Sequence, residues 1–135
     1  MKYNSQIINY INLFEDLTRT KVKDCFLNDE RIVFIINNGE ISRAIGKNGS
    51  NVRRIRNLIK KNIKLVEFND DVVKFVKNYI YPIEAKDVIL VDSKISIKVN
   101  DIKSKALLMG RNSKNLLELK EVLNRYFIIN GIKII

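Results

Sequence analysis

The sequence predicts an α+β protein made of two similar units in tandem, each ordered helix, strand, strand, helix, helix, strand. Short runs rich in β-branched residues alternate with amphipathic helical patterns, which is typical of a mixed fold. A breaker interrupts a helical pattern at residues 46–49 and again at 110–113. The residues around the two breakers match at a spacing of 64 positions, which indicates a repeated structural unit.

Matched polar and apolar positions define the repeat. The pairs are Gly46 with Gly110, Asn48 with Asn112, Asn51 with Asn115, Ala44 with Leu108, Val52 with Leu116, and Ile55 with Leu119. Two copies of this length account for nearly the whole chain, so we predict domains at residues 1–68 and 69–135. No Pro-, Ser- or Gly-rich linker separates them. We therefore expect the two units to pack as one rigid body.

The elements of the first unit follow from periodicity and from turn residues. Ile7, Ile11 and Phe14 recur at helical spacing after Ser5, a candidate N-cap. The elements expected are a helix at 5–17, strands at 21–27 and 31–36 joined by a hairpin connection at 28–30, a helix at 40–45, a loop at 46–49, a helix at 51–61 and a strand at 63–68.

The second unit repeats this order. A helix at 71–80 follows Asp70, a candidate cap, and it ends before Pro82 because the residue before proline is pushed out of the helical region. The remaining elements expected are strands at 87–91 and 95–99 around a turn at 92–94, a helix at 103–109, a loop at 110–113, a helix at 114–127 and a strand at 132–135.

The composition favours a polyanionic partner. The 135-residue chain has a formal net charge of +10 and a pI near 9.8, with the excess of cations shared by both halves. No apolar run approaches the ~18–20 residues that span a membrane, so no membrane partner is expected. The N-terminus does not resemble a signal peptide, and the single Cys25 suits a reducing compartment. We therefore expect a cytoplasmic protein.

The same composition argues against an enzyme. The chain has no His, the commonest general base and metal ligand. Cys25 lies in an expected strand and is interpreted as a buried thiol rather than a nucleophile. Acids such as Glu15 and Asp16 are sequence neighbours, so their side chains point apart. No catalytic residue, metal site or cofactor is expected.

The strongest binding motif is the first breaker, Gly46-Lys47-Asn48-Gly49. It lies within residues 41–64, which contain eight Lys or Arg and no acid. Glycine permits close approach and positive φ, and a helix N-terminus presents unpaired N–H donors, so the motif suits a phosphate group. The alternative interpretation is a basic, glycine-rich turn that only joins two helices.

The element order, with a Gly-x-x-Gly loop between the two internal helices, resembles the type II KH domain. Two such units in tandem look like the RNA-binding part of the transcription factor NusA, and the chain is similar to short archaeal NusA-like proteins over essentially its whole length. The resemblance implies a non-enzymatic factor that binds single-stranded RNA and acts on nascent transcripts in elongation or termination. Bacterial relatives carry further domains, one of them polymerase-binding, for which this chain has no room.

The resemblance also implies a site. KH loops clamp the backbone of about four nucleotides. Here Gly46 and Gly49 would admit phosphates, Lys47 and Asn48 would supply charge and donors, and bases would lie on a floor near Ile45 and the strand at 32–36. The full set of expected RNA-binding residues is Arg43, Ile45, Gly46, Lys47, Asn48, Gly49, Ser50, Arg53 and Arg54 in the first copy, and Gly110, Arg111, Asn112 and Lys114 in the second.

The two copies differ in their outward-facing chemistry. The helix after the first loop is expected to bury Val52, Ile55, Leu58 and Ile59 and to present arginines, whereas the outward positions of the second include Leu117, Glu118 and Glu121. Ser113 replaces the last glycine of the second loop, and Ser tolerates positive φ poorly, so it is expected to cap the next helix instead. RNA contact by the second copy is therefore left open. Leu117, if exposed, is expected to pack against the other unit or a partner protein.

Two alternatives to the leading function remain. A type II KH protein can also be a ribosome-associated or RNA-processing factor, or a protein-interaction module whose charge only improves solubility. The candidate protein partners are accordingly RNA polymerase and the ribosome. A monomer is expected.

Overall fold

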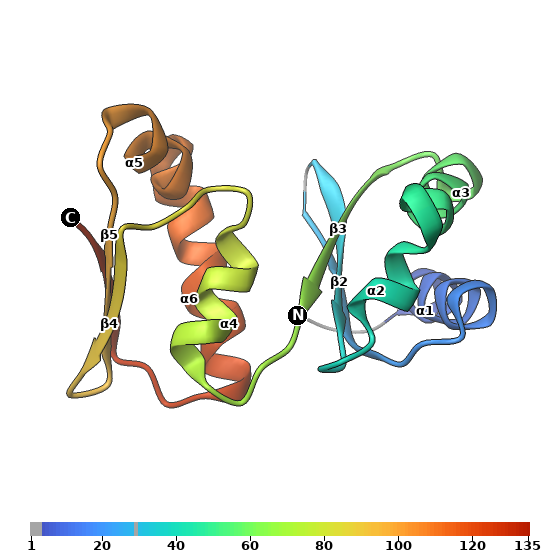
Figure 1. Cartoon of the computed structure of the whole chain (residues 1–135), viewed down its shortest axis with the longest axis horizontal. Helices are drawn as coiled ribbons and strands as arrows, with labels where there is room; N and C mark the ends of the chain where they lie inside the picture. Colours follow the sequence, from blue (N-terminus) through green and yellow to red (C-terminus); the bar gives the residue numbers. More distant parts are fainter. Residues whose placement is uncertain (1–3, 29) are drawn as a thin grey trace. The chain divides into compact units, whose positions relative to one another are not determined.

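The computed structural model describes residues 4–28 and 30–135, which form two compact units, Met1–Asn69 and Asp70–Ile135 (Figure 1). Each unit contains a three-stranded sheet whose one face is covered by helices (Figure 1). The predicted α+β class and element order are confirmed, and the ends of the elements lie within two residues of those expected. Rigid packing of the two units stays a prediction.

In the first unit, the central strand of the sheet pairs with both of the other strands. The elements are α1 (Ser5–Thr18), β1 (Val22–Leu27), β2 (Arg31–Ile36), α2 (Ile41–Ile45), the 3-10 turn η1 (Lys47–Gly49), α3 (Ser50–Ile59) and β3 (Asn62–Glu67). β2 pairs antiparallel with β1 and parallel with β3, so β3 is an edge strand.

In the core of this unit, side chains of the helices pack against β2. Phe14 of α1 stacks on Phe34 of β2 with ring centroids 4.4 Å apart. Ile55 of α3 is fully buried in the same cluster. Burial of these side chains fixes α3, and with it the loop that precedes α3, on the sheet.

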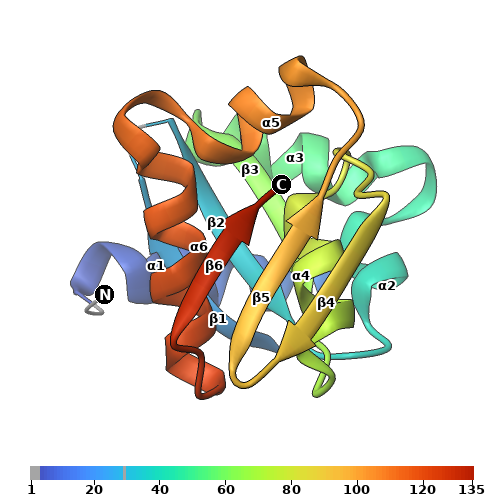
Figure 2. The same ribbon diagram turned by 90° about the vertical axis from the view of Figure 1, so that its left-hand side faces the viewer.

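The second unit repeats the arrangement. Its elements are α4 (Val72–Ile80), β4 (Asp87–Val91), β5 (Lys94–Lys98), α5 (Ile102–Met109), the 3-10 turn η2 (Arg111–Ser113), α6 (Lys114–Tyr126) and β6 (Gly131–Ile134). Figure 2 faces its sheet, which has the order β4-β5-β6. The buried Phe75 of α4 forms edge-on contacts with Tyr79 and Tyr126, so an aromatic cluster joins α4 to α6.

Both predicted helix caps are wrong by one residue. The N-cap of α1 is Asn4, whose Oδ1 accepts a hydrogen bond from the Ile7 N–H at 2.9 Å, and not Ser5. The N-cap of α4 is Asp71, whose Oδ1 accepts from the Val73 N–H at 2.9 Å, and not Asp70. A cap has extended backbone and directly precedes the first helical residue, which Asn4 and Asp71 satisfy. The hairpin connection predicted at 28–30 includes Asp29, which lies outside the described residues.

Cys25 is buried on β1, which confirms its interpretation as a core thiol. Burial, aided by the nearby Asp24 carboxylate, raises the pKa of the thiol to about 12 from its ordinary value of 9.0. The folded chain therefore holds this proton more tightly than the unfolded chain. The resulting contribution to stability is complete below about pH 9 and is lost as the pH rises toward 12.

We expect Cys25 to resist alkylation in the folded protein. At pH 8 the folded chain should hold a roughly 1000-fold smaller fraction of thiolate than the unfolded chain, because its pKa is about three units higher. Iodoacetamide labelling followed by mass spectrometry measures this, with the urea-unfolded chain as the control. Similar labelling rates for the folded and unfolded chains would contradict the prediction.

Neither a metal cluster nor a membrane-crossing helix is found in the described part of the chain. Within residues 4–28 and 30–135, no group of three or more His, Cys, Asp or Glu could hold a metal ion. No helix among the described residues combines the length and the apolar character needed to cross a membrane.

Candidate nucleic-acid interface

The first glycine of the first loop is required both by its backbone conformation and by its surroundings. Gly46 has φ 78° and ψ 170°, a region that L residues rarely adopt. A Cβ built there would lie 2.8 Å from Ser50 Oγ and 2.9 Å from the backbone N of Asn51. The chain therefore turns directly against the first residues of α3, with no room for a side chain.

A small hydrogen-bond network holds this loop in place. The Gly46 N–H donates to the Ser42 carbonyl at 3.0 Å, and the Gly49 N–H donates to the Gly46 carbonyl at 3.1 Å. The Asn51 side-chain amide donates to the Arg43 carbonyl at 2.9 Å, which ties the start of α3 to α2. These bonds fix the loop from within and leave the side chains of Lys47 and Asn48 exposed.

The second loop has the same backbone. Gly110 has φ 74° and ψ 170°, and its N–H donates to the Ala106 carbonyl at 2.9 Å. Asn112 has φ 55° and ψ 34°, against φ 55° and ψ 29° at Asn48. The Asn115 amide donates to the Leu107 carbonyl at 2.8 Å, which reproduces the bond made by Asn51. The two loops are thus built to one plan.

Ser113 corrects the expectation that a serine would change the second loop. It adopts the left-handed conformation, φ 59° and ψ 24°, that Gly49 has in the first loop. It does occupy the N-cap position of α6, but its side chain makes no capping hydrogen bond. Hydrogen bonds made by Gly110 and Asn115 hold the turn, so the local preference of serine is overridden.

An apolar groove of about 460 Å³ lies beside the first loop. Its lining residues are Ile45, Gly49, Val52, Arg53, Arg56, Ile63 and Leu65. Ile45 lines this groove as expected, but its strand residues are Ile63 and Leu65 of β3 and none belongs to the strand at 32–36. Ile32, Phe34 and Ile36 are fully buried because β2 is the central strand beneath the helices, whereas β3 lies at the edge.

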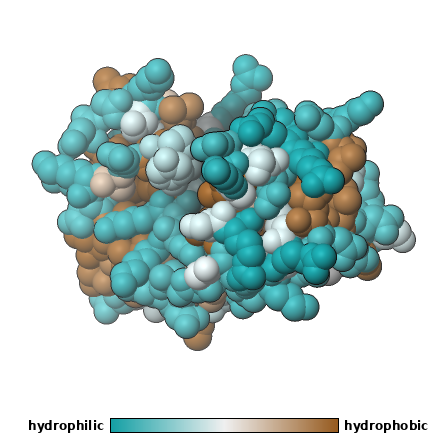
Figure 3. Space-filling view, turned by 45° about the vertical axis from the view of Figure 1, so that its right-hand side comes forward, coloured by the Kyte–Doolittle hydropathy of each residue, from teal (hydrophilic) through white to brown (hydrophobic). Residues whose placement is uncertain are grey.

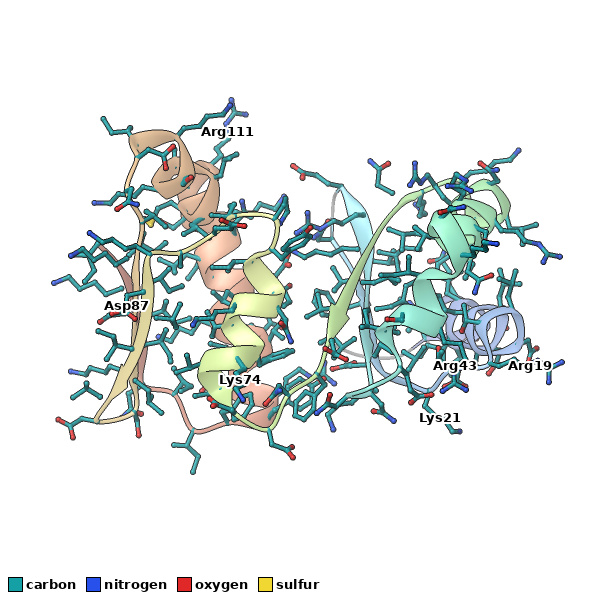
Figure 4. The ribbon with its side chains drawn as sticks, in the orientation of Figure 1. Arg19, Lys21, Arg43, Lys74, Asp87 and Arg111 are labelled. Carbon is teal, nitrogen blue, oxygen red and sulfur yellow. The ribbon has the colours of Figure 1, made fainter. Side chains whose placement is uncertain are left out.

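Exposed cations surround the loop and the groove. Arg53 and Arg54 project from α3, and the Arg53 guanidinium donates to the carbonyl of Asn48. Arg43, labelled in Figure 4, is on α2 and forms an ion pair with Glu40 at 3.5 Å. Guanidinium groups suit phosphate because they offer several donors in a planar fork. In Figure 3, which brings the α3 side of Figure 1 forward, hydrophilic side chains surround patches of apolar surface.

The surroundings of the second loop are chemically different. Leu107 and Leu117 stand where the first unit has Arg43 and Arg53, and they are 52% and 61% exposed. Arg111 projects from the loop (Figure 4), and Lys114 begins α6. Glu118, expected to face outward, instead accepts a hydrogen bond from the Tyr79 hydroxyl at 2.5 Å. The second unit therefore keeps the loop but lacks the arginines around it.

Several parts of this site were not predicted from the sequence. The sequence pairs Asn51 with Asn115 but does not reveal that their side chains brace the loops. Ile63 and Leu65 were assigned to a strand without a role in the groove, and Leu58, expected on the buried face of α3, is 57% exposed. Each asparagine lies five residues after the first glycine of its loop, and this shared spacing is the sequence feature that could have indicated the hydrogen bond to the preceding helix.

Comparison with protein families connects this geometry to known proteins. The model of the KH domain family matches residues 8–107. A solved structure described as a crystal structure of APE1850 superposes with a TM-score of 0.72 and 26% identity, covering 98% of this chain and 100% of that one.

Several curated relatives share one name, "Probable transcription termination protein NusA". The protein from Methanocaldococcus jannaschii is 34% identical to this chain, covering all of this chain and 75% of the relative. The protein from Methanococcus vannielii is 33% identical, covering all of this chain and 80% of the relative. The protein from Halococcus morrhuae is 27% identical, covering 94% of this chain and 93% of the relative.

Proposed function

This chain belongs to the KH domain family and to the NusA-like proteins, and on that premise we propose that it is a non-enzymatic, RNA-binding transcription factor. It binds single-stranded segments of nascent transcripts and acts in elongation or termination. The relatives named as transcription termination proteins support the process, and the family match supports the ligand.

The observation that carries the proposal is the first loop together with its groove. The exposed Lys47 and Asn48 lie on a turn whose backbone is held from within, so the turn is available to an external phosphate. The apolar groove lies directly against Gly49 and Arg53, where bases attached to that phosphate backbone would lie. Only unstacked bases can enter such a groove, which favours a single strand over a duplex.

The site residues divide by role in this proposal. Gly46 and Gly49 give the backbone its close approach, while Lys47, Asn48 and Ser50 provide charge or donors at the phosphates. Ile45 contacts bases, and Arg43, Arg53 and Arg54 attract the strand. In the second unit, Gly110, Arg111, Asn112 and Lys114 make a weaker contact of the same kind.

We expect tighter binding to single-stranded RNA than to duplex RNA of the same length. If about four phosphates are neutralised, log K should fall with log salt at a slope of roughly −3, given about −0.7 for each phosphate of a single strand. Fluorescence anisotropy titration across salt concentrations measures both quantities. An affinity that does not change with salt, or tighter binding to the duplex, would contradict the proposal that the ligand is single-stranded RNA.

Crosslinking in cells tests the place of action. RNA that is crosslinked to the tagged protein and sequenced should derive from nascent transcripts, including unprocessed ends and spacers. A predominance of mature ribosomal RNA would instead support the ribosome-associated alternative. The same purified material is probed for RNA polymerase subunits and for ribosomal proteins, the two candidate protein partners. Gel filtration with light scattering tests the expected monomer.

A further inference from the structure

A second cavity of the first unit lies at the far end of α3 from the loop. It has a volume of about 630 Å³, and the described charged residues that line it are Arg31, Arg56, Lys60 and Lys61 and one acid, Glu30. The side chains come from the start of β2, from the end of α3 and from the residues that follow it. Four cations facing one acid give this cavity a strongly positive potential.

Arg31 gives this cavity an unusual feature. Its Nε atom is buried and has no hydrogen-bond partner among the described residues. Leaving a buried donor unpaired costs the free energy of its desolvation, so such groups are rare and call for an explanation. An oxygen acceptor bound in the cavity beside this guanidinium supplies the missing partner.

Helix stabilisation alone does not account for the cluster. Cations near a helix C-terminus interact favourably with its dipole, and Arg56 in the last turn of α3 and Lys60 and Lys61 directly after it are so placed. Arg31 belongs to a different element, and attraction to the helix end does not explain why its buried Nε atom is left without a hydrogen-bond partner among the described residues. Its unpaired donor, together with the cavity, favours an anion-binding site.

The two cavities share a wall. Arg56 lines both the basic cavity and the apolar groove beside the first loop. α3 has ten residues and so spans about 15 Å, with the loop at its N-terminal end and the basic cavity at its C-terminal end. An RNA strand that is held at the first loop and runs through the groove along α3 would therefore reach Arg31.

We propose that this basic cavity binds a further backbone phosphate of the same RNA strand that the first loop clamps. The first unit then holds more than the four nucleotides of a loop-centred site. Arg31 donates through Nε–H to a phosphate oxygen, and Lys60 and Lys61 supply charge. This inference rests on the proposed function, which it extends along the strand.

The test compares oligouridine of four and eight nucleotides on the full chain. The double variant Lys60→Gln/Lys61→Gln should weaken binding of the octamer about tenfold and leave the tetramer unchanged. The salt slope for the octamer should become shallower by about 0.7 for each phosphate that the variant no longer neutralises. Lys94→Gln/Lys98→Gln, on the exposed part of β5, removes the same charge and serves as the matched control.

A second variant isolates the unpaired donor. Arg31→Lys keeps the charge but removes the Nε–H group, so it should also weaken the octamer selectively. The NMR signal of the Arg31 Nε–H should shift on addition of the octamer and not of the tetramer. Unchanged octamer binding by Arg31→Lys would overturn the assignment of this donor.

The remaining outcomes separate the possible failures. If both oligonucleotides lose affinity equally, or if the loss is no larger than that of the control variant, the two lysines act only through the net charge of the protein. Either result would overturn the proposal. If inorganic phosphate shifts the Arg31 signal and added octamer does not displace that phosphate, the cavity binds a free anion instead, and the proposal is overturned. If the unaltered protein binds neither oligonucleotide, the proposed function itself fails.

Discussion

Replacing Lys47 and Asn48 with aspartate is expected to weaken single-stranded RNA binding by ~30–150-fold, equivalent to about 2–3 kcal/mol. Both side chains are exposed on η1, where the proposed function places a phosphate. The change removes one cation and adds two anions, so attraction is replaced by repulsion. The free energy of unfolding should move by under about 1 kcal/mol, because neither side chain is buried and Asp tolerates the left-handed backbone of Asn48.

The matched variant is Arg111→Asp/Asn112→Asp in the second loop. Its backbone equals that of the first loop, so a smaller loss cannot be attributed to a distorted turn. We expect a smaller loss because Leu107 and Leu117 stand in place of Arg43 and Arg53, which we propose attract RNA in the first unit. RNA titration and urea unfolding of both variants make the comparison. Equal losses would show that the leucines do not weaken the second site, and a larger loss there would reverse the ranking of the two loops.

The second large effect is expected from Gly46→Ala. The added methyl group would lie within 3 Å of Ser50 and Asn51, in a backbone conformation that alanine strongly disfavours. Strain and forced displacement together should lower the free energy of unfolding by about 2–4 kcal/mol. RNA affinity should fall as well, because the turn that presents Lys47 must shift away from α3.

Gly39→Ala provides the control for this prediction. Gly39 also has positive φ, +87°, but an added Cβ would meet no atom within 4 Å. Its cost should therefore be limited to backbone strain of about 1–2 kcal/mol, with RNA binding retained. Urea unfolding and RNA titration of the two variants separate strain from crowding. Equal destabilisation would mean that the contacts of Gly46 with α3 relax without cost.

The order of elements was predictable because each depends on local pattern. The breakers at Gly46 and Gly110, together with the repeat they anchor, were sufficient to place the internal helices of both units. The caps were missed because Asn4 precedes Ser5 and Asp70 precedes Asp71, so two good capping residues stand side by side at each helix start. The sequence does not distinguish them, since only the backbone at the helix start decides between neighbours.

The errors at the site have a tertiary origin. Whether a strand is central or at an edge depends on pairing between distant segments, and this decided that Ile63 and Leu65, and not the strand at 32–36, form the groove floor. Ser113 shows the same limit at a single residue. Serine does prefer negative φ, but the surrounding turn imposes the left-handed conformation on it.

The braces made by Asn51 and Asn115 have a consequence for how binding energy is distributed. Each loop is tied to the preceding helix before any ligand arrives, so the protein has little conformational freedom to lose on association. In the proposed function, most of the ordering cost then falls on the RNA, whose bases must leave their stacks to enter the groove. Selectivity between transcripts can therefore arise from the flexibility of the strand itself, even where no side chain distinguishes one base from another.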